Sequence, residues 1–229
     1  MFLSDLLIAK KYLFSQLALM VVVGVFMSVV MQNLYVIPPA IAVMVPFSIG
    51  FTLLALDERA GWEQFRLALP LSRANVIVGR YASFAAVVLM GMATGLLVTG
   101  LVALAAALLP GVPQLADMMV NFSWQAIVLS SVAGVTIVLA MLAVTLPVVS
   151  RFGMTKAVRF IPLAMVFGMV FLFSLGNGQP MPQFLVDLAA WIKTPEGTLG
   201  AAGIVAAAGC TLYALSCAAS VKLYEGREL

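Results

Sequence analysis

The segment from Asp57 to Tyr81 holds the densest group of side chains with which this sequence could do chemistry. Its twenty-five residues, DERAGWEQFRLALPLSRANVIVGRY, carry seven of the twenty-one charged residues in the chain. The stretches on both sides are almost free of charge. Carboxylates and guanidinium groups at this density can pair with one another or with complementary charges on another protein. The segment is therefore the first candidate for a functional site.

The first part of this segment, residues 60–69, has the pattern of a short amphipathic helix. Trp62, Phe65 and Leu69 recur at i, i+3 and i+7, which places them on one apolar face. Pro70 ends the helix because its ring is incompatible with a helix interior. The pattern predicts a helix that lies in the plane of the membrane, followed by a sharp turn.

The charged residues lie on another face of the predicted helix. Glu63 can pair with Arg59 at i−4 and with Arg66 at i+3. Asp57 and Glu58 come near its beginning, where the helix dipole favours negative charge.

Such a helix can rest on lipid or dock another protein. The acidic residues favour docking, because a segment made only for anionic lipid has no use for them. After the turn, Ser72 is suited to the N-cap of the next helix, and Arg73 follows it.

The sequence lacks the residues that several classes of membrane protein require for their chemistry. The sequence contains no His, and no charged residue lies deep in an apolar run. Proton-coupled pumps need intramembrane ionisable groups, and the usual membrane proteases need His or paired Asp. There is no metal-ligand cluster and no G-x-x-x-x-G-K-[ST] loop for nucleotide phosphates. We therefore expect no catalytic residue, no metal and no cofactor in this chain, and we expect it not to be an enzyme.

The elements that must position the charged segment are predicted from composition. Of the 229 residues, 64% are hydrophobic and only 9% are charged, against about a quarter charged in soluble domains. A span needs about 20 apolar residues. The chain is therefore predicted to be an all-α integral membrane protein, a single transmembrane domain over residues 1–229 with six helices. The spans are placed at about residues 13–31, 40–56, 81–109, 122–150, 159–176 and 198–220.

The placement of Lys and Arg predicts the orientation of these spans. One side receives eleven of the twelve basic residues, and only Lys193 lies on the other. Cytoplasmic loops carry the excess of basic residues, so both termini and the segment 57–80 are expected in the cytoplasm. The eleven residues are Lys10, Lys11, Arg59, Arg66, Arg73, Arg80, Arg151, Lys156, Arg159, Lys222 and Arg227.

The charged segment also resembles a known element. An acidic pair before Gly61-Trp62-Glu63, then LALPLSR, then Arg80-Tyr81 is similar to the first cytoplasmic loop of small type-two ABC transporter permeases. The resemblance covers the whole chain in topology and about 25 residues in motif. It implies that the loop is a coupling helix, which seats in a groove of a separate cytosolic ATPase subunit.

Two further segments resemble elements of the same family. Residues 2–12 resemble an interfacial helix that precedes the first span, although an ordinary basic lead-in fits equally well. Residues 182–193 predict an extracytoplasmic loop helix, and the family places a gate there. Phe184, Leu188 and Trp191 are the gate candidates, with a plain interfacial helix as the alternative.

A small-residue stripe on the third span predicts close helix packing. Gly91, Gly95 and Thr99 recur every four residues, so they let another helix backbone approach. The partner helix is expected within the chain, with a dimer contact as the alternative.

We expect an exporter, and the absence of charge within the apolar runs indicates a hydrophobic or amphipathic substrate such as a peptide, a lipid or a drug. The resemblance implies a peptide or an antimicrobial compound. Two such chains, identical or closely related, would pair in membrane lipid above two ATPases that bind ATP and Mg²⁺. We expect a bacterial plasma-membrane location and no nucleic-acid partner. A gradient-driven carrier or channel without an ATPase is the alternative hypothesis.

Overall fold

The structure is a computed structural model that describes residues 2–59, 72–109, 119, 122–152 and 183–225. These residues form helices and their connections, without strands. The helices are α1 (Phe2–Met31), the 3₁₀ helix η1 (Leu34–Val36), α2 (Ile37–Arg59), α4 (Arg73–Leu108), α6 (Trp124–Phe152), α8 (Gln183–Ile192) and α9 (Pro195–Glu225). The described part of the chain is thus all-α, as predicted.

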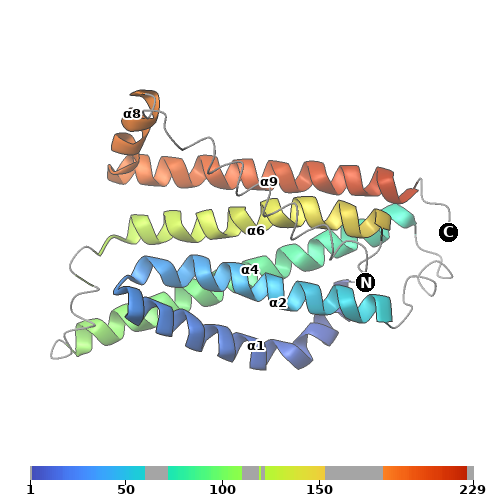
Figure 1. Ribbon diagram of the computed structural model, residues 1–229, viewed down its shortest axis with the longest axis horizontal. Helices are drawn as coiled ribbons and strands as arrows, with labels where there is room; N and C mark the ends of the chain where they lie inside the picture. Colours follow the sequence, from blue (N-terminus) through green and yellow to red (C-terminus); the bar gives the residue numbers. More distant parts are fainter. Residues whose placement is uncertain (1, 60–71, 110–118, 120–121, 153–182, 226–229) are drawn as a thin grey trace.

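Five long helices lie side by side along the long axis, and α8 stands across the beginning of α9 (Figure 1). Helix α2 contacts α1, α4 and α6, whereas α9 contacts α6, α4 and α8. Helices α2, α6 and α9 end, and α4 begins, at one end of the bundle (Figure 1). We call this the basic end, because Arg80, Arg151 and Lys222 belong to those helix ends. Lys193 belongs to the opposite end.

Three of these helices are long and apolar enough to cross a membrane: Ala74–Leu108, Trp124–Arg151 and Pro195–Tyr224. Two shorter apolar stretches, Ser15–Met31 and Leu34–Gly50, accompany them. The predicted fifth span, 159–176, lies outside the described residues. Six crossings and cytoplasmic termini therefore remain predictions.

Helix boundaries differ from the predicted ones at the first two spans. Residues 2–12 and 13–31 form one helix, α1, because neither Pro nor Gly interrupts the sequence before Gly24. The predicted break falls at Gln32, whose φ is +49°, and at Asn33, whose side chain accepts a hydrogen bond from the Tyr35 backbone N–H. Pro38 lies in the first turn of α2, where a backbone N–H has no helical partner to lose.

Two apolar clusters hold the described helices together. One packs η1 and α2 against α1 and α4 through Leu34, Ile41, Val45 and Val98. The other joins α4, α6 and α9 near the basic end and includes ten buried residues. Its members are Ile77, Tyr81, Phe84, Val88, Val138, Leu139, Leu142, Leu146, Val149 and Tyr224.

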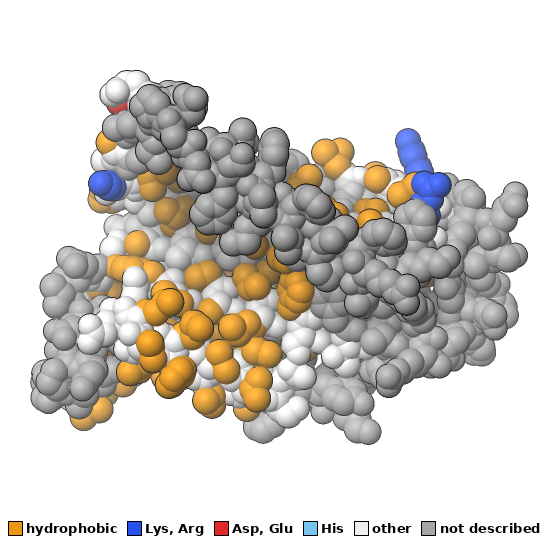
Figure 2. Space-filling model, viewed as in Figure 1, with side chains coloured by type: hydrophobic (Ala, Val, Ile, Leu, Met, Phe, Trp, Pro, Cys, Tyr) orange, Lys and Arg blue, Asp and Glu red, His pale blue; other side chains and the backbone are white. Residues whose placement is uncertain are grey.

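Apolar side chains are exposed over a broad area of the surface (Figure 2). Phe26, Leu97 and Leu215 are each more than 65% exposed. Soluble proteins rarely show such extended apolar surface, whereas the lipid-facing side of a span requires it. Among the described residues, every buried side-chain donor or acceptor has a hydrogen-bond partner, as a low-dielectric surrounding demands.

Candidate functional site

The structure brackets the charged segment between two helices at the basic end. Asp57 and Glu58 lie in the last turn of α2, and Arg73 is the first residue of α4. The first charged residues of the segment thus belong to α2 and the last ones to α4. The remaining predicted coupling residues lie outside the described residues: Trp62, Glu63, Phe65, Arg66, Leu69 and Pro70.

Ser72 is the N-cap of α4, which confirms its predicted capping role. Its backbone is extended, with φ −66° and ψ 144°, and its Oγ accepts a hydrogen bond of 3.2 Å from the Asn75 backbone N–H. This bond satisfies one of the free N–H groups in the first turn. Helix α4 therefore begins with a capped first turn inside the segment from Asp57 to Tyr81.

Two turns further along α4, Tyr81 joins three helices through hydroxyl groups. Its Oη lies 2.8 Å from Ser216 Oγ and 2.7 Å from Ser220 Oγ, both on α9. Ser216 Oγ in turn donates a hydrogen bond of 2.7 Å to the Ala143 carbonyl oxygen on α6. We refer to Tyr81, Ser216 and Ser220, together with Tyr213 of α9, as the Tyr81 cluster.

The donors in this cluster follow from counting protons. A hydroxyl group has one proton to donate. Ser216 gives its proton to Ala143, so Ser216 accepts from Tyr81. Tyr81 has then used its proton, so Ser220 is the donor to Tyr81. The result is a one-way chain of donors from Ser220 through Tyr81 and Ser216 to the α6 backbone, and such chains polarise and strengthen one another.

Tyr213 adds a bond to the α4 backbone itself. Its hydroxyl donates a hydrogen bond of 2.8 Å to the Tyr81 carbonyl oxygen, and the two rings lie 4.9 Å apart at an angle of 50°. Tyr81 is 4% exposed and Ser220 is fully buried. Water therefore has little access to compete for these hydrogen bonds. Helices α4 and α9 are joined by both polar and aromatic contacts.

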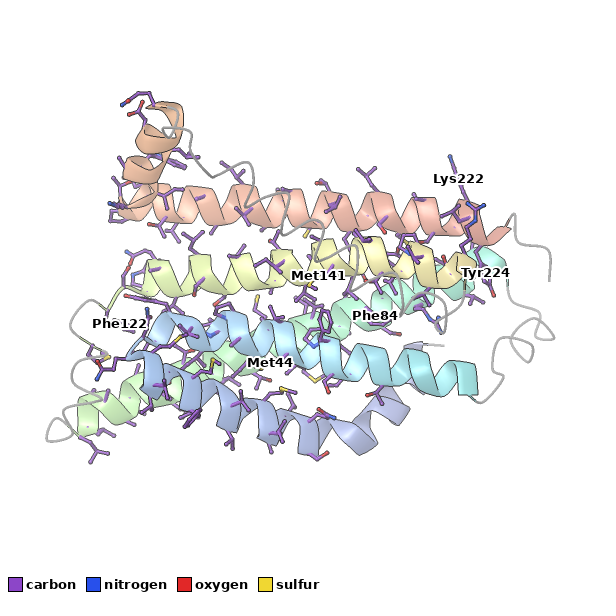
Figure 3. The ribbon with its side chains drawn as sticks, in the orientation of Figure 1. Met44, Phe84, Phe122, Met141, Lys222 and Tyr224 are labelled. Atoms are coloured by element: carbon purple, nitrogen blue, oxygen red, sulfur yellow. The ribbon has the colours of Figure 1, made fainter. Side chains whose placement is uncertain are left out.

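Apolar residues surround the Tyr81 cluster. Phe84 lies among the helices, and Tyr224 lies at the basic end of α9 while Lys222 projects outward from the same helix (Figure 3). Phe84 and Tyr224 belong to the same buried cluster as Tyr81. The polar bonds thus lie beside packed apolar side chains of α4, α6 and α9.

The predicted stripe of small residues on α4 lies against α2. A Cβ added to Gly91 would lie 3.3 Å from Val45 Cβ, and one added to Gly95 would lie 3.0 Å from the Pro38 carbonyl oxygen. Thr99 is buried, and its hydroxyl donates to the Gly95 carbonyl oxygen at 2.8 Å. The close approach at these two glycines is a contact within the chain.

At the opposite end, the predicted gate residues lie on α8. Leu188 and Trp191 are exposed, and the side chain of Phe184 lies outside the described residues. Trp191 also covers Gly200 of α9, since a Cβ there would lie 2.9 Å from its ring. Thr198 Oγ1 donates to the Ile192 carbonyl oxygen at 2.6 Å, which fixes the corner between the two helices.

Sequence reasoning missed most of the Tyr81 cluster, because the partners of Tyr81 lie 135 and 139 residues further along the chain. A signal was present on α9. Tyr213, Ser216 and Ser220 recur at i, i+3 and i+7 in an otherwise apolar helix, and this spacing puts them on one polar face. Gly134 was also missed, although a Cβ there would lie 2.6 Å from Pro39 Cα.

The described residues include no group of three His, Cys, Asp or Glu side chains that could hold a metal ion. The site consists of a helix cap, a hydroxyl chain and packed rings. A comparison with protein families identifies the class of protein in which this site occurs. A family model described as ABC-2 family transporter protein matches residues 1–225.

The chain belongs to the ABC-2 transporter family. It is therefore a permease subunit of a type-two ABC transporter, the transmembrane component of that machinery. Membership in this family implies a partner ATPase subunit in general, and it supports a non-catalytic role for the permease. No curated protein and no solved structure matches the chain.

Proposed function

We propose that this ABC-2 permease couples ATP hydrolysis in a separate cytosolic subunit to the export of a hydrophobic or amphipathic substrate. The segment 57–73 is the docking element, and Trp62 and Glu63 are its central contacts. ATP and Mg²⁺ bind in the ATPase subunit. Two permease chains, identical or closely related, enclose the route across the membrane above two ATPases.

The Tyr81 cluster is the observation that carries this proposal. Tyr81 comes eight residues after Arg73, a distance of about 12 Å along a helix. A force applied to the start of α4 therefore meets, within about two turns, bonds to α9 and to the α6 backbone. A rigid connection of this kind moves three helices together, as alternating access in a permease requires.

The polar groups of the described helices support an apolar or amphipathic cargo. Most hydroxyl groups in the described spans bond to carbonyl oxygens of their own helix, such as Thr99, Ser131 and Thr145. No charged side chain among the described residues lies in the middle of a span. A peptide, an antimicrobial compound, a lipid or a drug-like molecule fits this environment better than an ion, which needs compensating charge.

Docking is tested by affinity purification in mild detergent after co-expression with the ATPase subunit. The test variant combines Trp62→Ala with Glu63→Arg. Its matched control combines Trp124→Ala with Glu196→Arg, which changes the same residue types at exposed positions of the opposite end. The unmodified chain and the control should retain the ATPase, and the test variant should lose it. Equal retention by all three would overturn the docking role of segment 57–73.

A further inference from the structure

An open groove lies between α4 and α9 beside the Tyr81 cluster. Five of the eleven described residues that line it are alanines, and their short side chains leave the space between the two helices unfilled. Tyr81 and Tyr213 also line the groove. The alanines are Ala74, Ala82, Ala85, Ala214 and Ala218.

Exposed leucines also occur on the same two helices. Leu89 of α4 and Leu212 and Leu215 of α9 are all exposed. The alanines that line the groove are shorter than these leucines, so the groove between the two helices is left open. A flexible apolar chain could fill it and cover the edge of the Tyr81 ring.

The groove carries a positive charge at the basic end. Lys222 is one of its lining residues and is exposed. It is the basic residue in the last turn of α9. The basic end is expected on the cytoplasmic side, where the leaflet contains anionic lipids and where a Lys near the surface attracts them. The long lysine side chain can place its ammonium group at headgroup level while its methylene groups stay in the apolar region.

We propose that this groove binds the acyl chain of an anionic phospholipid of the cytoplasmic leaflet, with its phosphate at Lys222. The apolar alanine walls accept the chain, and the ammonium group supplies the opposite charge. The proposal rests on the expected orientation of the chain and does not depend on an ATPase.

Lipid binding is tested on the full chain purified in detergent, with no ATPase present. Phosphatidylglycerol or phosphatidylcholine is added back, and native mass spectrometry counts the lipids retained. Lys222→Gln should lower phosphatidylglycerol affinity about fivefold, the effect of one lysine near a membrane surface, and should leave phosphatidylcholine unchanged. Lys193→Gln at the opposite end is the matched control and should change neither.

The acyl-chain site is tested by filling the groove. Ala218→Phe places a ring in the groove, whereas Ala219→Phe changes the next residue, which is exposed and does not line the groove. The first variant should lose bound phosphatidylglycerol and the second should keep it. Equal retention by both would overturn the proposal, as would equal affinities for the two lipids in the unmodified chain.

The two native cysteines provide a readout that needs no substitution. Cys217 lines the groove, and Cys210 is exposed elsewhere on α9. Added phosphatidylglycerol should slow the reaction of Cys217 with a lipid-soluble maleimide and leave Cys210 unaffected. A Cys217–Cys217 cross-link between two chains that persists in excess phosphatidylglycerol would show that a second copy occupies the groove, and this result would also overturn the proposal.

Discussion

Tyr81, the last residue of the charged segment, connects α4 with α9 and, through Ser216, with α6. Its hydroxyl group accepts from Ser220 and donates to Ser216, and its carbonyl oxygen accepts from Tyr213. Each of these bonds reaches α9, which the described structure otherwise leaves largely exposed. Tyr81 is therefore a positioning residue whose loss should loosen α9 from α4 without emptying the core.

Tyr81→Phe should lower the free energy of unfolding by about 1–2 kcal/mol. The change removes two hydrogen bonds and keeps the ring, and one bond contributes about 0.5–1.5 kcal/mol in general and somewhat less on average in membranes. Unfolding in mixed detergent micelles measures the difference.

The control for Tyr81→Phe is Ser131→Ala. The Ser131 hydroxyl is equally buried, but it bonds only to the Ile127 carbonyl oxygen of its own helix, at 2.6 Å. Ser131→Ala should therefore lower the free energy of unfolding clearly less than Tyr81→Phe does. Equal losses of unfolding free energy would show that hydrogen bonds between helices stabilise the permease no more than a bond within one helix.

At the level of the elements, glycines on α4 and α6 allow these two helices to pack closely against α2. Gly95 of α4 faces Pro38, and Gly134 of α6 faces Pro39. Both contacts involve backbone atoms of α2, which cannot rotate away as a side chain can. The first turn of α2 is therefore closely packed between α4 and α6.

Gly134→Ala should destabilise the permease by about 1–3 kcal/mol, the usual cost of overpacking a core. The added Cβ would lie 2.6 Å from Pro39 Cα, so α2 and α6 must separate. Gly100→Ala is the matched control on α4, because nothing lies within 4 Å of its added Cβ. That control should be neutral or slightly stabilising, since Ala favours a helix more than Gly. Thermal unfolding in detergent compares the two variants, and equal transition temperatures would contradict the close contact.

The sequence predicted where helices occur along the chain better than it predicted which helices contact one another. Apolar runs and prolines indicated where helices occur, because lipid requires continuous helices and proline marks a helix start. The bounds were less well indicated: α4 begins at Arg73, eight residues before the predicted span 81–109. The stripe from Gly91 to Thr99 was visible as a packing surface, but its spacing contained no information on which helix it meets. Gly134 and Ser216 were missed for the same reason: their roles depend on residues far away in the chain.

At the scale of the whole molecule, the described helices have a basic end and an opposite end that carries Lys193 (Figure 1). The excess of Lys and Arg on one side predicts that the basic end faces the cytoplasm. The proposed docking segment and the proposed lipid groove both lie at this end. Orientation is therefore a requirement that the two proposals share.

Single cysteines should reveal this orientation in a chain without its two native cysteines. Ser72→Cys lies at the start of α4 and Lys193→Cys lies after α8, and both positions are exposed. A maleimide that cannot cross membranes should label position 193 in right-side-out vesicles and position 72 in inside-out vesicles. The reverse pattern would place the charged segment outside the cell and exclude contact with a cytosolic ATPase.

Coupling itself is measured most directly by ATP hydrolysis in liposomes that contain the permease and its ATPase subunit. The unmodified permease and the Trp124→Ala, Glu196→Arg control should change the hydrolysis rate of the ATPase to the same extent. The Trp62→Ala, Glu63→Arg variant should leave the rate at that of the ATPase alone. If this variant changes the rate as much as the unmodified chain does, segment 57–73 does not transmit ATP-driven movement to α4.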